Sequence, residues 1–499
     1  MLDTDPSLIA ALRADLAAAD YSVTHVLDLL GPVAANALAR EQVIPAERVT
    51  RESTDPAAVL VRLFTLGDPV DQARVEAALP RLGAAGALRL GLVRAEGDAL
   101  LALVDLRPYG DDEHTWWIAS DLSELATRAP LPVDHVLGVG GASATLAAWT
   151  PRPRVRRALD LGTGCGVQAL HLSTHAEEIV ATDISERALN IVRFNAALNE
   201  QDWDIRQGSM LEPVAGERFS LIVSNPPFVI TPRDHGLPTY EYRDGGQSGD
   251  AVVEHLVTHL GEHLEPGGIA QIIGNWEVVG DAAWGERVAD WAARAGVDVL
   301  VLMREMQDPA QYAETWARDG GQQSGTGEFA RMYAAWLDDF AARGVSGIAF
   351  GLITLHRPAD ERTPWIEIRD ARGPVRPPLG PVLLAQVEAR DWLARHTDQE
   401  VLDTAWTVAP DVTLVQVSRP GEPDLSYLEL RQSEGLQQSD LLSGDFGTAA
   451  AAYIGVADGE LTARQAIVAI AALLDRDQAV LLDDFTIRIR QWVADGILR

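Results

Sequence analysis

Residues 158–173, ALDLGTGCGVQALHLS, combine an apolar run, a loop with Gly162, Gly164 and Gly166, and the start of a helix-like sequence. Glycine allows tight backbone turns and close approach of a ligand, and a new helix offers free N–H groups at its first turn. A bound nucleoside can therefore lie over this loop. The G-x-G-x-G spacing differs from the G-x-G-x-x-G of a dinucleotide pyrophosphate site, so the usual nicotinamide fingerprint is not met.

The glycine loop belongs to a longer alternation of short apolar runs and helical segments. We expect strands at 155–162, 178–185, 203–210, 219–227, 267–276, 297–305 and 346–357. Such alternation predicts an α/β fold, with a mostly parallel, Rossmann-like sheet of seven strands covered by helices on both faces. Residues 308–344 exceed what a hairpin needs, so we expect extra helices there, at an edge of the sheet and beside an acceptor pocket.

Two further regions flank this α/β region. Helix-like periodicity at 7–21, 55–67 and 71–90 is followed by two short strands within 91–110, a pattern like a winged helix. Residues 357–380 are rich in proline and charge and indicate a linker or a loose edge. We predict an N-terminal accessory domain at 1–130, a catalytic domain at 131–360 and a C-terminal accessory domain at 361–499, which we expect to be helical or a second winged-helix-like module.

The composition restricts where and on what the protein acts. The chain has 499 residues and a net charge of −32, which disfavours a non-specific grip on DNA. No stretch approaches the roughly 20 apolar residues of a membrane span, and the first residues lack a signal-peptide pattern, so we expect a cytoplasmic protein without membrane contact. The single cysteine, Cys165, excludes disulfides and multi-cysteine zinc sites, and we expect no metal site.

Asp183 follows the second expected strand, about twenty residues beyond the glycine loop. A carboxylate can accept hydrogen bonds from both hydroxyls of a ribose. It can equally cap the helix that begins at Ser185, as Asp often does near a helix N-terminus. Its distance from the glycine loop favours the ribose.

The sequence FSLIVSNPPFVI ends an apolar strand directly in Asn225, Pro226, Pro227 and Phe228. Two prolines make the turn rigid, so the Asn225 side-chain carbonyl and the Pro226 backbone carbonyl can both face one planar amine. The ring of Phe228 can stack on a flat acceptor. The alternative is an ordinary Asn-Pro turn with Phe228 in the core. An acceptor –NH2 on an amide or a base fits best.

Together these motifs resemble the class I S-adenosylmethionine-dependent methyltransferases from about residue 130 to 360. The resemblance implies that Asp160 anchors the methionyl amine of S-adenosylmethionine and that Asp183 holds the ribose. Ser209 stands where this family commonly has an adenine-binding carboxylate, so adenine would rest on backbone N–H groups and Met210. The cofactor-binding residues that we expect are Asp160, Gly162, Thr163, Gly164, Gly166, Asp183, Ile184, Ser209, Met210 and Asn225, with S-adenosylhomocysteine as product.

The acceptor turn resembles the N-P-P-[FYW] motif of adenine or guanine amino methyltransferases and of HemK/PrmC-type glutamine methyltransferases. The D-G-G-x-x-G stretch at 244–249 favours the glutamine group, whereas the glycine-rich segment at 134–149 is more similar to ribosomal RNA guanine methyltransferases. Secondary candidates for the donor's methionyl end are Gly138, Gly140, Gly141 and Ser143.

We therefore expect an N-methyltransferase with a macromolecular acceptor, either a protein glutamine or, as the alternative, an RNA base amine. A nicotinamide-dependent oxidoreductase is a different class, which leaves Asn225–Phe228 without a role. A non-catalytic scaffold that binds the donor through a decayed fold is another, against which the intact Asp160, Asp183 and Asn225 argue.

Overall fold

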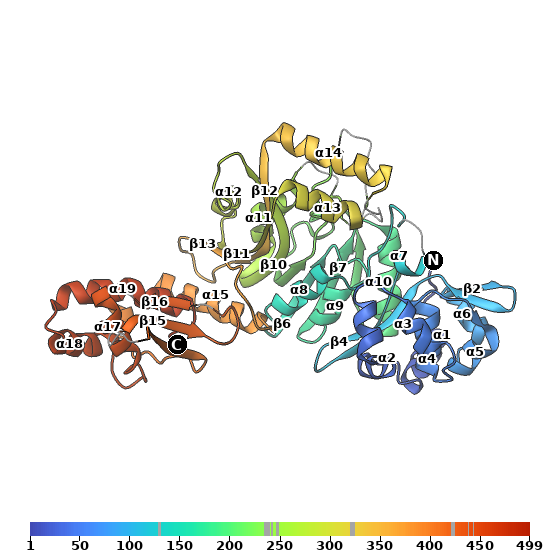
Figure 1. Cartoon of the computed structure of the whole chain (residues 1–499), viewed down its shortest axis with the longest axis horizontal. Coiled ribbons are helices and arrows are strands. Elements are labelled where there is room, and N and C mark those ends of the chain that lie inside the picture. The colour runs from blue at the N-terminus through green and yellow to red at the C-terminus, as the bar shows by residue number, and fades with distance from the viewer. Residues whose placement is uncertain are drawn as a thin grey trace. The chain divides into compact units, whose positions relative to one another are not determined.

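The computed structural model describes residues 1–127, 131–233, 240, 243–245, 249–319, 325–420, 425–437, 439–442 and 444–499 (Figure 1). The chain forms two compact units. The first comprises 1–146, 154–296 and 305–357, and the second comprises 147–153, 297–304 and 358–499. Among the helices in the described part of the chain, none has the length and hydropathy that crossing a bilayer requires.

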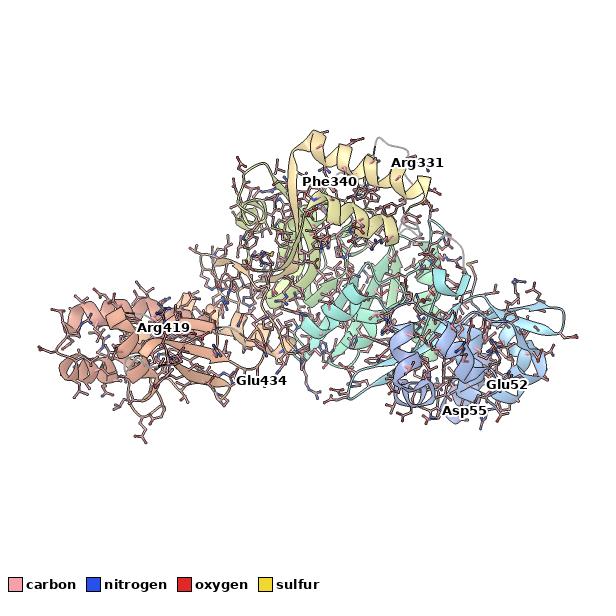
Figure 2. All side chains as sticks on the ribbon, in the orientation of Figure 1. Glu52, Asp55, Arg331, Phe340, Arg419 and Glu434 are labelled. Atoms are coloured by element: carbon pink, nitrogen blue, oxygen red, sulfur yellow. The ribbon has the colours of Figure 1, made fainter. Side chains whose placement is uncertain are left out.

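The N-terminal part of the first unit consists of helices followed by hairpins, as predicted. Its helices are α1 (Pro6–Ala18), α2 (Val23–Leu38), α3 (Ile44–Thr50), α4 (Pro56–Leu60), the π-helix η1 (Val61–Thr65), α5 (Gln72–Ala78) and α6 (Gly83–Arg89). Asp55, labelled in Figure 2, begins α4 by accepting a hydrogen bond from the Ala57 N–H at 2.8 Å. The strands β1 (Val70–Asp71), β2 (Val93–Glu96) and β3 (Ala99–Ala102) form a small antiparallel sheet in the order β1-β3-β2. A second hairpin, β4 (Asp105–Gly110) with β5 (Thr115–Ser120), follows.

The central sheet confirms the predicted α/β class. Its strands are β6 (Val155–Leu161), β7 (Ala176–Asp183), β8 (Asp204–Gln207), β9 (Phe219–Ser224), β10 (Leu264–Val279), β11 (Asp298–Gln307), β12 (Val345–His356) and β13 (Ile366–Asp370), in the order β13-β11-β12-β10-β9-β6-β7-β8. All seven predicted strands are present. The eighth, β13, lies in the segment that we predicted as a linker or loose edge and pairs in parallel with β11. Its two apolar residues, Ile366 and Ile368, lie within a segment rich in proline and charge, so we predicted no strand there.

The direction of the strands decides at which edge of the sheet their following loops lie. The β6–β7, β6–β9, β7–β8 and β9–β10 pairs are parallel, whereas β10 and β12 are antiparallel. The helices of this region are α7 (Glu124–Thr127), α8 (Gly141–Trp149), α9 (Val167–Leu172), α10 (Glu186–Leu198), η2 (Glu212–Val214), α11 (Ala251–His259), η3 (Leu260–His263) and α12 (Glu286–Arg294). The carboxyl ends of β6, β7, β8 and β9 therefore meet at one edge, where ligands bind in open α/β sheets.

The insertion between β11 and β12 is helical, as predicted, and consists of α13 (Pro309–Asp319) and α14 (Gly327–Arg343). Its core is aromatic. Tyr312 of α13 packs edge-on against Phe340 of α14, with ring centroids 5.7 Å apart, and Phe340 is labelled on α14 in Figure 2. The buried Trp336 and Met332 complete this cluster, which holds the two helices together.

The second unit carries its own core. Its further elements are α15 (Gly380–Arg395), α16 (Asp398–Leu402), β14 (Val412–Ser418), β15 (Leu425–Gln432), β16 (Ser439–Leu442), α17 (Gly444–Ile454), α18 (Ala463–Leu473) and α19 (Gln478–Ala494). The three strands form an antiparallel sheet in the order β14-β15-β16. Tyr453, Phe485 and Trp492 are buried among the helices. The predicted C-terminal helices are present, but the sequence analysis did not predict the sheet of β14, β15 and β16. The limits of the three predicted domains, at 130 and 360, stay predictions.

Candidate active site

A cavity of about 540 Å³ lies within the first unit, at the carboxyl ends of β6, β7, β8 and β9. It brings together most of the residues that the sequence singled out. The predicted residues that line it are Gly162, Thr163, Gly164, Asp183, Ile184, Ser209, Met210, Asn225, Pro226 and Pro227, together with the secondary candidates Gly138 and Ser143. Gly140 and Gly141, predicted with them, lie instead at the start of α8 and outside this lining.

The glycine loop turns with positive φ at each of its glycines, with values of 72° at Gly162, 56° at Gly164 and 90° at Gly166. A Cβ added at Gly162 or Gly164 would meet no atom within 4 Å, so these two positions leave space beside the backbone. Gly166 is different, because a Cβ there would lie 2.9 Å from Val192 and 3.1 Å from Trp203. Gly166 is thus required for packing beneath the loop, not for the cavity wall.

Asp160 lies under the loop instead of in the cavity wall. It is 1% exposed and accepts hydrogen bonds from the Thr163 hydroxyl at 2.6 Å and from the Ala169 N–H at 2.9 Å. Burial raises the pKa of Asp160 to about 7, and these two hydrogen bonds oppose the rise. The carboxyl group therefore shapes the loop and the first turn of α9, and its predicted contact with the methionyl amine stays a prediction.

Asp183 and the residues after β8 line a further part of the cavity. Asp183 accepts hydrogen bonds from the Gly164 N–H and the Ser185 N–H, both at 2.9 Å. It therefore bridges the glycine loop and the beginning of α10, and both the ribose and the capping interpretations fit its position. Ile184 lines the cavity while 60% exposed, and Met210, with φ of 46°, lines it from the segment after β8.

The acceptor turn follows β9 directly. The side-chain N–H of Asn225 donates to the Ser143 hydroxyl at 3.3 Å, and Asn225, Pro226 and Pro227 line the cavity. Phe228 lies just outside this lining, where its ring packs edge-on against Trp316 of α13, with centroids 6.3 Å apart. Phe228 is half-buried, so its predicted stacking on an acceptor stays a prediction.

The α13–α14 insertion holds the exit of this turn. The Ile230 N–H donates to the Tyr312 hydroxyl at 2.8 Å, and the Ile230 carbonyl accepts from the Trp336 indole N–H at 2.7 Å. Asn275 of β10 donates to the same Tyr312 hydroxyl at 2.9 Å. Both backbone groups of Ile230, two residues beyond Phe228, are therefore bound by side chains, which hold the chain where it leaves the turn.

The D-G-G-x-x-G stretch also contacts the turn. Asp244 forms a backbone bridge with Phe228 and accepts from the Thr231 hydroxyl. A Cβ added at Gly245 would lie 2.8 Å from the Pro227 carbonyl oxygen, so the two segments touch. Burial raises the pKa of Asp244, opposed by the charge of Arg243. Gly246, the second glycine of the motif, lies outside the described residues.

Arg187 is a site residue that sequence reasoning missed. It lines the cavity from the first turn of α10 and makes two hydrogen bonds, at 2.8 and 2.6 Å, to Asp121, just after β5. Asp121 raises the pKa of Arg187 through these bonds. Asp121 also accepts from the Val136 N–H at 2.8 Å, and Val136 lines the cavity. The signal in the sequence that could have found Arg187 is its position four residues after Asp183. Its partner Asp121, however, lies 66 residues away in sequence.

Two stretches of the chain match protein-family models. Residues 138–286 match the family model of the methyltransferase small domain. This match confirms the predicted methyltransferase resemblance for the part of the chain that contains the cavity. Residues 18–103 match the model of a domain of unknown function, DUF7059.

The chain is similar to proteins of both predicted acceptor classes. It is 35% identical to the release factor glutamine methyltransferase of Deinococcus radiodurans over 28% of this chain and 60% of that protein. The putative protein N5-glutamine methyltransferase of Methanocaldococcus jannaschii is 30% identical over 23% of this chain and 59% of its own length. The ribosomal RNA small subunit methyltransferase C of Salmonella arizonae is 30% identical over 35% of this chain and 45% of its own length. This chain thus spans about half of the length of these relatives.

The packing beneath the loop predicts unequal effects of two glycine substitutions. Gly166→Ala should lower the free energy of unfolding by roughly 2–4 kcal/mol, because it adds overlap with Val192 and Trp203 to the strain of positive φ. Gly162→Ala, the matched control, carries only that strain and should cost about 1–2 kcal/mol. Urea denaturation of both variants measures the difference; equal losses would contradict this account of Gly166.

The raised pKa of Asp160 predicts a pH-dependent stability difference. The folded protein keeps a proton on Asp160 up to about pH 7, whereas the unfolded chain releases it near pH 4. The free energy of unfolding should therefore fall as pH rises from about 4 to 7, by up to about 1.4 kcal/mol per pH unit, relative to Asp160→Asn. Denaturation of both proteins across this range checks the sign, and a difference that does not change with pH would rule out the raised pKa.

Proposed function

We propose that this protein transfers a methyl group from S-adenosylmethionine to the nitrogen of a planar amide or amine. The observation that carries the proposal is the single cavity that Gly162–Gly164, Asp183 and Asn225–Pro227 line together. Donor and acceptor residues must share one space, because the reacting nitrogen has to approach the methyl carbon directly. A nicotinamide-dependent oxidoreductase would leave the acceptor turn without a role.

The residues present suit the donor. A volume of about 540 Å³ lies within the range of small-molecule and cofactor pockets. The open space at Gly162 and Gly164 lets a ligand lie against the loop backbone. Asp183 provides the carboxylate for a ribose, and the apolar Ile184 and Met210 suit the faces of an adenine ring. S-adenosylmethionine supplies an electrophilic methyl group on a sulfonium centre when it is bound.

The contribution of the chain to the reaction is orientation and removal of water. The Asn225 side-chain carbonyl and the Pro226 backbone carbonyl accept the two N–H bonds of the acceptor nitrogen, which directs its lone pair into the cavity. Ser143 fixes the Asn225 side chain by accepting its N–H, so that the carbonyl end faces the acceptor. Tyr312 and Trp336 keep the turn rigid from behind, through Ile230.

A protein glutamine is the acceptor that we favour. The N-P-P-F turn and the adjoining Asp244–Gly245 segment support it, as does the similarity to proteins named glutamine methyltransferases. An RNA base amine is the second candidate, favoured by the similarity to a ribosomal RNA methyltransferase and by the glycine-rich segment at 134–149. Either acceptor is a macromolecule of translation, which fits a cytoplasmic location.

Donor binding should depend on Asp183. Calorimetric titration of S-adenosylmethionine into Asp183→Ala should show at least a tenfold weaker affinity than for the wild-type protein, since roughly 1.5–3 kcal/mol of charge-assisted hydrogen bonding is lost. Asp202→Ala changes an exposed carboxylate beyond α10 and should bind normally. NADH binding to the wild-type protein without S-adenosylmethionine binding would overturn the proposed reaction.

Methyl transfer should depend on Asn225. With donor at saturating concentration, Asn225→Ala should lower kcat by about 10²–10³-fold on its acceptor, because one of the two orienting groups is removed. Glutamine-containing peptides and RNA fragments, tested in parallel with labelled donor, identify the acceptor class. Undiminished transfer by Asn225→Ala would exclude the assigned role of the turn.

A further inference from the structure

Two asparagines on α10 and a third at its C-cap contact the N-terminal part of the chain, and each pairs with both backbone groups of one residue. Asn190 bonds the N–H and C=O of Leu2, at 2.7 and 2.9 Å. Asn195 bonds those of Ala119, both at 2.8 Å, and Asn199 bonds those of Trp117, at 3.0 and 2.8 Å. An amide side chain offers one acceptor and two donors, so it can make the two hydrogen bonds to a residue's backbone that a neighbouring β-strand would otherwise make. The three side chains attach α10 to β5 and to the N-terminus.

Asn195 makes one contact that its two counterparts lack. Its side-chain N–H group also donates to the Cys165 carbonyl at 2.8 Å, so this fully buried amide joins β5 to the glycine loop. Cys165 lies between Gly164 and Gly166, the part of the loop that must keep positive φ on both sides. The acceptor and both donors of the Asn195 amide are thereby used, and a buried polar group satisfied in this way holds its partners firmly.

The end of β5 reaches the cavity by a second route. Asp121 follows β5 directly and binds Arg187 through two hydrogen bonds and the Val136 N–H through a third. Arg187 and Val136 both line the cavity. Residues 115–121 therefore support the cavity through Asn195, which bonds the glycine loop, and through Asp121, which bonds the lining residues Arg187 and Val136.

We propose that Asn195 is a positioning residue for donor binding, and that β5 of the N-terminal part is a component of the donor site. This inference rests on the proposed function only for the identity of the donor. Asn195 does not line the cavity and acts through the Cys165 carbonyl, which sets the path of the loop between Gly164 and Gly166. The donor site is incomplete without the N-terminal part of the chain.

Asn199 provides a matched control, because it bonds the same strand in the same manner and its partners are Trp117 and Asn195, not the loop. Both Asn195→Ala and Asn199→Ala of the full chain should lower the melting temperature. In hydrogen–deuterium exchange without ligand, amides of residues 162–167 should exchange at least about tenfold faster in Asn195→Ala and at the wild-type rate in Asn199→Ala. Calorimetry should show a rise of about tenfold in the Kd of S-adenosylmethionine for Asn195→Ala alone.

Equal exchange rates of the loop in the two variants would overturn the positioning role of Asn195, whether they are both fast or both slow. So would equal affinities of the two variants for a donor that the wild-type protein binds. If the wild-type protein binds no S-adenosylmethionine, the proposed function fails by itself. The exchange measurement uses protein without ligand, so it still decides whether Asn195 holds the loop.

Discussion

The loop between β6 and α9 must pass through three glycines with positive φ while a carboxyl group is buried beneath it. The buried Asp160 carboxyl group holds the loop in this path, because it accepts hydrogen bonds from the Thr163 hydroxyl within the loop and from the Ala169 N–H in the first turn of α9. The Gly162 and Thr163 N–H groups are bound in turn by the Thr182 carbonyl at the end of β7. The loop is thus also held by the strand that carries Asp183, so β6, β7 and α9 fix its path together with the Asn195 contact to the Cys165 carbonyl.

Parallel strand order converts this local geometry into a site. Because β9, β6, β7 and β8 are neighbours and point the same way, their following loops open at one edge. The order and direction of the strands are therefore enough to make the acceptor turn after β9 face the glycine loop after β6. The contacts that keep it there come from outside this core, from α13 and α14 through Ile230 and from Ser143 of α8.

The glycine loop and the acceptor turn could be predicted because each is one continuous stretch of sequence. The glycine loop and Asn225–Pro227 appear where predicted, because a strand ending in a rigid or glycine-rich turn is a local pattern. Asp160 lies under the loop and Phe228 beside Trp316, outside the cavity lining, because burial depends on packing that no short pattern reports. The strand β13 was missed for a similar reason, since its stability comes from pairing with β11.

By itself the sequence determined the alternation of strands and helices, the positions of the turns, and the residue types that can hold a nucleoside and a planar amine. These features depend on neighbours along the chain, through periodicity, glycine and proline. Only the tertiary structure decided that Arg187 meets Asp121, that Asn225 meets Ser143 and that Asn195 connects β5 to the glycine loop. The Asp121, Ser143 and Ala119 partners lie 66, 82 and 76 residues away in sequence, and such distances are closed by the packing of the whole unit, not by any local preference.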